Sequence, residues 1–270
     1  MHLEPLQWIL GAAAALFVGI SKTGVPGLGI LVVILLANVF GARSSVGIML
    51  PMLIFGDFFA VAWYRRHCQW DKLIGLLPWV VVGMGIGSGA LWLTGKAGGN
   101  KDVLSILIGV LVLVMLGLYL LQDRLGERLT PKSKAGVAST GVSAGFATTV
   151  SNAAGPVMTI YLQAHKLPKE QFMGTIAWYF LIINVSKLPI YFVLTAMNPQ
   201  KPIVTHESLI FNLITFPAVL AGVSHARGLV RRAAALLAGC ALAANSPADR
   251  EQTPSRRIGA WWTHRAGRFW

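Results

Sequence analysis

The sequence is poor in charged residues and in cysteine. Only 12% of its 270 residues are Asp, Glu, Lys or Arg, about half the share of a soluble domain, so an ordinary soluble fold is not expected. Cys68 and Cys240 are the only cysteines and form no metal-ligand spacing, which indicates neither a disulfide framework nor a zinc site. The histidines show no ligand spacing, and no grouping of Ser, His and an acid points to a hydrolase. We therefore predict that the protein is not an enzyme and needs no metal or cofactor.

Nucleotide-binding motifs are absent from the sequence as well. Residues 83–89 have a glycine at every second position, but the run fits neither G-x-G-x-x-G nor the P-loop spacing. It lies inside an apolar segment, where glycines more often allow close helix packing. Close packing is therefore the better interpretation of these glycines, and ATP hydrolysis is not expected.

Long apolar segments dominate the chain instead. Hydrophobic residues make up 55% of it and the mean hydropathy is +0.63, which favours an all-α polytopic membrane protein. A chain of this length has room for about eight spanning segments of about 20 residues each. No Lys or Arg precedes the first apolar segment, so we expect that segment to be retained rather than cleaved as a signal. The apolar segments cover residues 6–20, 27–40, 44–64, 73–94, 102–121, 136–150, 156–165, 171–195 and 208–222.

Two polar, glycine-rich breaks interrupt this pattern. The first is residues 21–27 (SKTGVPG) and the second is residues 151–156 (SNAAGP), and both keep the spacing Ser-x4-Pro. The apolar stretch on either side of a break is too short to cross a bilayer of about 30 Å alone. Two interpretations remain open, a spanning helix broken at its centre and a re-entrant hairpin that returns to its own side.

The two breaks belong to a longer internal similarity. Gly47 and Asp57 are ten residues apart, as are Gly174 and Asn184, in the segment that follows each break. We predict two pseudo-symmetric repeats of about four helical segments, the first of each broken at mid-membrane. If the broken segments are hairpins, each half has an odd number of spans, and the repeats are inverted. The predicted parts are repeat 1 (1–121), a linker (122–135), repeat 2 (136–222) and an atypical tail (223–270).

Basic residues indicate the orientation and set the tail apart. Lys and Arg concentrate in the loops 65–72 and 122–135, which the positive-inside rule places in the cytoplasm under either interpretation of the breaks. Of the net charge of +13, residues 223–270 contribute eight Arg and two acids. The apolar run 233–244 predicts a weak last helix before a solvated basic tail, and we expect no nucleic-acid partner. A tail that is not the native terminus is the alternative.

The breaks carry the chemistry that points to function. Pro26 and Pro156 suit the first turn of a resumed helix, so two helix N-termini are predicted to face the membrane centre. Such an end presents free N–H groups and a partial positive charge to an anion. Packing alone also explains small polar residues, but the duplication and a lysine at mid-membrane favour a site. The predicted substrate-binding residues are Ser21, Lys22, Thr23, Gly24, Ser151, Asn152 and Gly155.

Three further polar residues lie inside apolar segments. Asp57 is 13 residues into its segment, and Asn184 and Lys187 share a later one. A carboxylate at this depth serves as a proton relay, an ion ligand or the partner of a buried lysine. A coupling role and an intramembrane ion pair with Lys22 or Lys187 both remain open.

The two breaks and the Gly-x9-Asp/Asn pattern after each resemble the sulfite exporter TauE/SafE family of bacterial membrane proteins. The resemblance covers about residues 6–222, and the tail lies outside it. It implies a secondary transporter that moves a small anion, sulfite or an organosulfonate, across the cytoplasmic membrane by alternating access. An ion gradient, protons included, or the substrate gradient would drive it. The alternatives are a cation transporter that uses Asp57 and a membrane sensor or assembly subunit that transports nothing.

Overall fold

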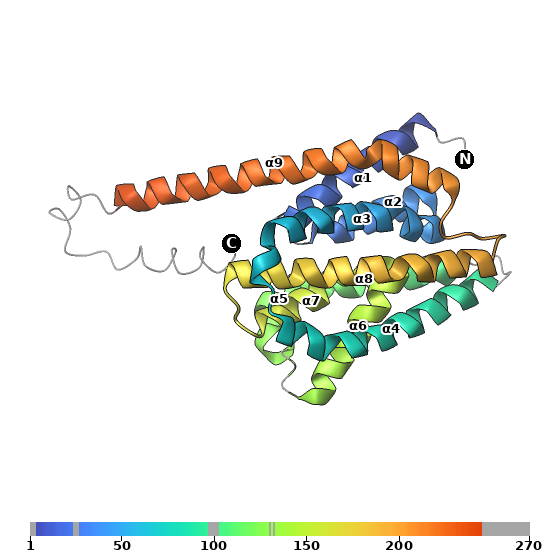
Figure 1. The fold of residues 1–270 in the computed structure, drawn as a ribbon, viewed down its shortest axis with the longest axis horizontal. Coiled ribbons are helices and arrows are strands. Elements are labelled where there is room, and N and C mark those ends of the chain that lie inside the picture. Colours follow the sequence, from blue (N-terminus) through green and yellow to red (C-terminus); the bar gives the residue numbers. More distant parts are fainter. Residues whose placement is uncertain (1–3, 24–26, 97–102, 130, 132, 245–270) are drawn as a thin grey trace. The chain divides into compact units, whose positions relative to one another are not determined.

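The computed structural model describes residues 4–23, 27–96, 103–129, 131 and 133–244. These residues form nine α-helices and one short 3₁₀ turn, with no strand among them (Figure 1). In chain order the elements are α1 (Pro5–Thr23), α2 (Leu28–Phe40), α3 (Ala42–Tyr64), η1 (Arg65–His67), α4 (Trp70–Lys96), α5 (Val103–Leu129), α6 (Lys134–Ser151), α7 (Gly155–Gln163), α8 (Lys169–Met197) and α9 (His206–Ala244).

The distribution of side chains confirms the prediction of an all-α polytopic membrane protein. Six of the described helices, namely α1, α3, α4, α5, α8 and the first part of α9, are long and apolar enough to cross a bilayer. Large apolar side chains such as Leu113, Leu120 and Leu213 are more than half exposed, whereas Asp57 and Lys187 are buried. Lipid is a suitable solvent for the first group, and charges in membrane proteins face the interior of the bundle.

Two helices are longer than the sequence predicts. Helix α5 continues to Leu129, through most of the predicted linker 122–135. Helix α9 joins the apolar segment 208–222 to the alanine-rich run 233–244 without interruption. Leu, Arg, Glu and Ala are strong helix formers, so polar or short apolar stretches can extend a helix that has already started. The chain divides into two units, residues 1–226 and 227–270, and the structure describes only the end of α9 in the second.

Helices α4 and α6 pack closely and run parallel. A Cβ at Gly83 would meet the backbone of Val142, and a Cβ at Gly87 would meet the backbone of Phe146. The close-packing prediction is therefore confirmed for these two glycines. At the other two glycines of the run 83–89, an added Cβ would have no described atom within 4 Å, so they belong to the opposite face of α4.

Both broken segments fold back on themselves as hairpins. Gln7, near the start of α1, donates a hydrogen bond of 3.1 Å from Nε2 to the carbonyl oxygen of Val39, near the end of α2. In the second hairpin, Tyr161 near the end of α7 donates from its hydroxyl to the carbonyl oxygen of Lys72, at the start of α4, over 3.0 Å. Because α6 starts at that same end of α4, α7 returns to the level at which α6 begins. The structure therefore has the hairpin form of the two interpretations.

Helices α3 and α8 pack antiparallel, and Figure 1 shows α8 between α3 and the pair α4 and α6. A Cβ at Gly47, early in α3, would meet the backbone of Ile203, which follows α8. A Cβ at Gly174, early in α8, would meet the backbone of Tyr64 and His67, where α3 ends. Gly47 and Gly174 occupy matching positions in the two predicted repeats. Each thus lies against the chain at or just after the end of the other's helix. Inverted repeats lead to contacts of this kind, although the repeat itself stays a prediction.

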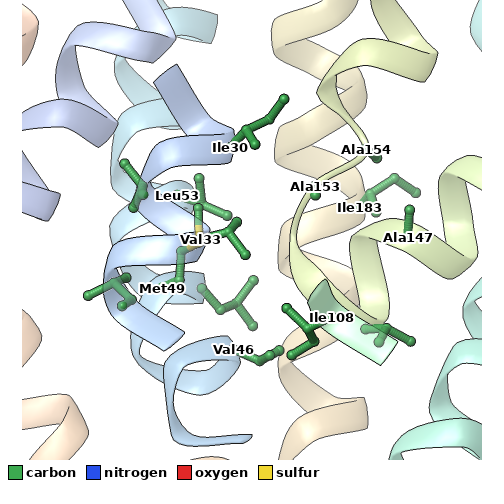
Figure 2. Close-up of a cluster of buried hydrophobic side chains, with 14 of the residues drawn as sticks. Ile30, Val33, Val46, Met49, Leu53, Ile108, Ala147, Ala153, Ala154 and Ile183 are labelled. Atoms are coloured by element: carbon green, nitrogen blue, oxygen red, sulfur yellow. The ribbon is translucent and has the colours of Figure 1, made fainter. Parts of the chain in front are cut away.

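The apolar core lies between the two hairpins. Figure 2 shows Ile30 and Val33 of α2 on one side, and Ala153 and Ala154 of the α6–α7 connection on the other, with Ile183 of α8 beside them. These side chains are buried. Since lipid tails are as apolar as the core, van der Waals packing rather than the hydrophobic effect holds such helices together. The small alanines let the non-helical connection approach its neighbours closely.

Candidate functional site

A cavity of about 160 Å³ lies where the two breaks approach each other. Seven helices line it, and most of the lining side chains are apolar. Since a water in the liquid occupies about 30 Å³, the cavity has room for a small oxyanion. The polar side chains that line it are Ser21, Lys22, Asp57, Tyr119, Thr148, Asn152, Thr159 and Asn184.

Most of the predicted site residues are brought together at this cavity. Two are not, because Ser151 and Lys187 are buried behind its wall. The side chain of Thr23 and the whole of Gly24 lie outside what the structure describes. The predicted residues that line the cavity are Ser21, Lys22, Asp57, Asn152, Gly155 and Asn184.

Lys22 and Asp57 form an ion pair at one wall of the cavity. The distance from Lys22 Nζ to Asp57 Oδ1 is 2.6 Å, with side-chain exposures of 12% and 1%. Asn184 donates from Nδ2 to the other carboxylate oxygen, Oδ2, over 2.6 Å. Lys22 Nζ also lies 4.4 Å from the centroid of the Phe180 ring, a cation–π contact. Both oxygens of Asp57 are therefore engaged, and Lys22 keeps limited access to the cavity.

Asn184 has an unused acceptor at this site. Its Oδ1 is buried and has no hydrogen-bond partner within the described part of the chain. The amide thus donates to Asp57 with its nitrogen while its oxygen stays free. An amide can present either a donor or an acceptor to the same neighbour by rotating through half a turn.

Lys187 has a different environment from Lys22. It is fully buried, and its Nζ donates to Thr148 O at 3.0 Å, to Thr148 Oγ1 at 3.0 Å and to Asn152 Oδ1 at 2.6 Å. No described carboxylate lies within salt-bridge distance of it. One turn further along α8, the Tyr191 hydroxyl donates to Thr149 O over 2.8 Å. Lys187 therefore adds a second donor to Thr148 O, which also accepts from the N–H of Asn152, and Tyr191 donates to Thr149 O. A positive charge is favourable at this end of α6.

The polar atoms of the second break are used within the protein. Asn152 has a left-handed backbone (φ 56°, ψ 20°), which Asn tolerates better than most residues. Its Nδ2 donates to the carbonyl oxygen of Val46 in α3 over 3.1 Å. Ser151 donates back into its own helix, to Ala147 O over 2.9 Å. The structure thus assigns Asn152 to joining helices at the cavity wall, and turns the Ser151 hydroxyl away.

Two helices begin at the cavity, and Pro26, predicted in the first turn of one of them, lies outside the described residues. Helix α7 starts at Gly155, with Pro156 in its first turn, and helix α2 starts directly after Gly27. Neither N-terminus has a side-chain cap among the described residues. Gly27 and Gly155 both line the cavity, and a Cβ at Gly155 would meet no described atom within 4 Å. The cavity thus contacts two uncapped positive helix ends.

Sequence reasoning missed three residues at the site. Phe180 lies one turn before Asn184 on α8, so a search for aromatic residues on the face of a buried polar one would have found it. Thr148 precedes the second break by one turn and accepts from Lys187. Tyr119 of α5 lines the cavity from outside both predicted broken segments, and no sequence signal marks it.

A second cavity of about 250 Å³ lies against α5, α6 and α7. Ser139, Thr140 and Ser143 line it from α6, and Val157, Ile160 and Tyr161 line it from α7. The first cavity uses other residues of α7, namely Gly155, Pro156 and Thr159. Two faces of this short helix therefore border two separate spaces.

Cys68, between η1 and α4, is the cysteine whose side chain the structure describes. Its partial burial raises the pKa of the thiol to about 11, so it stays protonated and weakly nucleophilic at neutral pH. No group of three His, Cys, Asp or Glu side chains among the described residues is placed to hold a metal ion.

The family model "Sulfite exporter TauE/SafE" matches residues 11–246. The match passes residue 222, where the sequence resemblance was expected to end, which corrects that boundary. The physical reason is the unbroken helix α9, which makes residues 223–244 part of the same element as the apolar segment before them. Comparison with curated proteins and with solved structures gave no match. Since the match covers both breaks and most of the chain, the protein belongs to the sulfite exporter TauE/SafE family of membrane transporters for sulfite-type anions.

Proposed function

We propose that the protein is a secondary transporter that exports a small oxyanion, sulfite or an organosulfonate, across the bacterial cytoplasmic membrane. The observation that carries the proposal is Lys22, a largely buried cation inside the helical bundle that borders a cavity between two uncapped helix N-termini. A charge at this depth is unfavourable by about 2.5 kcal/mol or more unless it is compensated. A cation that keeps access to a cavity at that depth is suited to binding an anion.

The cavity supplies further groups that favour an oxyanion. Helix N-termini offer N–H donors and a partial positive charge, and Ser21 offers a hydroxyl at the cavity surface. Cation transport through Asp57 has less support, because one carboxylate oxygen pairs with Lys22 and the other accepts from Asn184. A sensor or assembly subunit stays an alternative that transport assays distinguish, because such a protein would bind the anion without moving it.

Alternating access fits the arrangement of hairpins and cavities. The hairpins meet at the first cavity, and α7 separates that cavity from the second one. We propose that one half of the molecule rocks against the other and exposes the Lys22 site to each side in turn. The antiparallel helices α3 and α8 are the hinge surface in this proposal. Gly47 of α3 lies against Ile203, which follows α8, and Gly174 of α8 lies against the end of α3.

Radiolabelled sulfite uptake into proteoliposomes tests the proposal. We compare the protein with Lys22→Met, which keeps the length of the side chain and removes its charge, and with Lys169→Met at an exposed lysine. Uptake by the protein and by Lys169→Met, with loss in Lys22→Met, is the expected result. Equal uptake in Lys22→Met would overturn the anion site at the first break. Saturable binding without uptake would favour the sensor.

A further inference from the structure

We propose that Asp57 is a proton-binding site, and that each monovalent anion bound at Lys22 enters together with one proton on the Asp57 carboxylate. This inference rests on the proposed function, and it names the co-transported ion and the residue that carries it. In the structure, Asp57 Oδ1 lies 2.6 Å from Lys22 Nζ. A substrate oxygen that pairs with Lys22 needs the same position. Asp57 therefore acts as a tethered anion that competes with the substrate.

Charge balance at the site supports proton uptake. When no anion is bound, Lys22 and Asp57 neutralise each other at a position where an uncompensated charge is strongly disfavoured. An anion added beside an ionised Asp57 would place two negative charges against Lys22, the cation that lines the cavity, because the N–H groups of Lys187 are directed at Thr148 and Asn152. When a proton adds to a carboxylate oxygen of Asp57, Lys22 keeps its charge, and the anion takes the place of the carboxylate. The net charge of Lys22, Asp57 and the anion together is then zero in both states, the charge of Lys187 does not change, and no electrons are transferred.

Among the charged groups around Asp57, Lys22 is the one placed to exchange the carboxylate for the anion. Helix α1 contributes Lys22, and α8 contributes Lys187, whose three N–H groups are directed at Thr148 and Asn152. Helix α5 contributes the Tyr119 hydroxyl to the cavity, while α2 has no titratable side chain. The titratable residues of α6 and α7 do not line the cavity. Lys187 cannot move to the anion without leaving Thr148 Oγ1 and Asn152 Oδ1 without their donor.

Asn184 is suited to both protonation states of Asp57. Its Nδ2 donates to the ionised carboxylate, while its buried Oδ1 has no partner in the described part of the chain. After protonation, a half-turn of the amide lets Oδ1 accept a hydrogen bond from the new carboxyl O–H. The unused acceptor thus has a role in the loaded state.

Methanesulfonate is the probe, because its charge does not change with pH, and binding is measured by calorimetry on the full-length protein in nanodiscs. Linkage of one proton to binding predicts an affinity that rises about tenfold for each unit by which the pH falls, over the range in which the free protein has Asp57 ionised. In Asp57→Asn, which retains an acceptor for Asn184, the affinity is expected to be independent of pH. Asp57→Glu keeps an acid and should keep the slope, as should Glu170→Gln, which removes an exposed acid.

Each outcome either supports or overturns proton binding at Asp57. A pH slope in the protein that disappears in Asp57→Asn and remains in Asp57→Glu supports the inference. A flat profile in the unaltered protein, or an equal slope in Asp57→Asn, overturns it and leaves anion transport standing. Failure of the unaltered protein to bind methanesulfonate and sulfite at any pH overturns the proposed function, and this inference with it. As a second readout, a pH dye inside proteoliposomes should report proton movement with methanesulfonate, and none in Asp57→Asn.

Discussion

The two helix breaks solve one physical problem in different ways. Each frees backbone groups at a depth where water is scarce, and each has a lysine nearby. At the first break the lysine is part of the break itself, pairs with Asp57 and keeps access to the cavity. At the second break the lysine comes from α8, is fully buried and donates to α6 and Asn152. From this comparison we infer that Lys22 binds the substrate and that Lys187 stabilises the fold.

Replacement of Lys187 is expected to have the largest effect. Lys187→Met leaves Thr148 Oγ1 and Asn152 Oδ1 without their donor, while Thr148 O keeps the N–H of Asn152, and a buried unsatisfied group costs about 1–3 kcal/mol. We expect the unfolding temperature in detergent to fall sharply, with loss of about 3 kcal/mol or more of stability. Lys166→Met, at an exposed lysine, is the control. A Lys187→Met variant that is stable but binds no anion would contradict the comparison, because it would assign anion binding to Lys187.

Replacement of Lys22 is expected to affect substrate more than fold. A hydrogen bond to a charged group contributes about 1.5–3 kcal/mol, so Lys22→Met should weaken anion binding about 10- to 100-fold. Asp57 then loses its partner but can take up a proton, so the stability loss should be smaller than in Lys187→Met. Calorimetry with sulfite and thermal unfolding of the same samples separate the two effects. Unchanged binding, with stability as low as in Lys187→Met, would contradict the comparison.

The cavity can be filled without touching either lysine. A Cβ at Gly155 meets no described atom within 4 Å, and the residue lines the cavity. Gly155→Leu should therefore reduce sulfite transport by about tenfold or more, equivalent to about 1.4 kcal/mol, while the unfolding temperature changes little. Gly85→Leu, on α4 where a Cβ also meets no described atom, is the matched control. Normal transport in Gly155→Leu would place the substrate elsewhere.

Replacement of Tyr191 is expected to have the smallest effect. It tests whether the second break has a structural role alone. Tyr191→Phe removes the hydrogen bond to Thr149 O and leaves the ring in place. The expected loss is about 1 kcal/mol of stability with transport retained, since Tyr191 does not line the cavity. Tyr161→Phe, which removes a hydroxyl bond near the end of α7, allows comparison at another site. Loss of transport at full stability in Tyr191→Phe would show that the second break does more than hold the fold.

Much of the site was predictable because charged residues are rare in membrane segments. Lys22 and Asp57 are exceptional at their depth, and either one marks its segment without knowledge of the fold. The sequence left their partners open, since Asp57 could have paired with either lysine. Ser151 was expected to face the substrate but bonds to Ala147 instead. A hydroxyl near a helix end can bond to its own helix or to a ligand, and residue type does not distinguish the two.

By itself, the sequence determined the helical membrane fold, the positions of both breaks and the presence of a cation in the first. These follow from local properties, because apolar length sets the spans and Gly and Pro end helices. Only the tertiary structure decided that each broken segment is a hairpin, that Lys22 rather than Lys187 pairs with Asp57, and that Asn184 donates to Asp57. These pairings connect residues up to 127 positions apart. Helix packing brings such residues together, and periodicity along one helix carries no information about its neighbour.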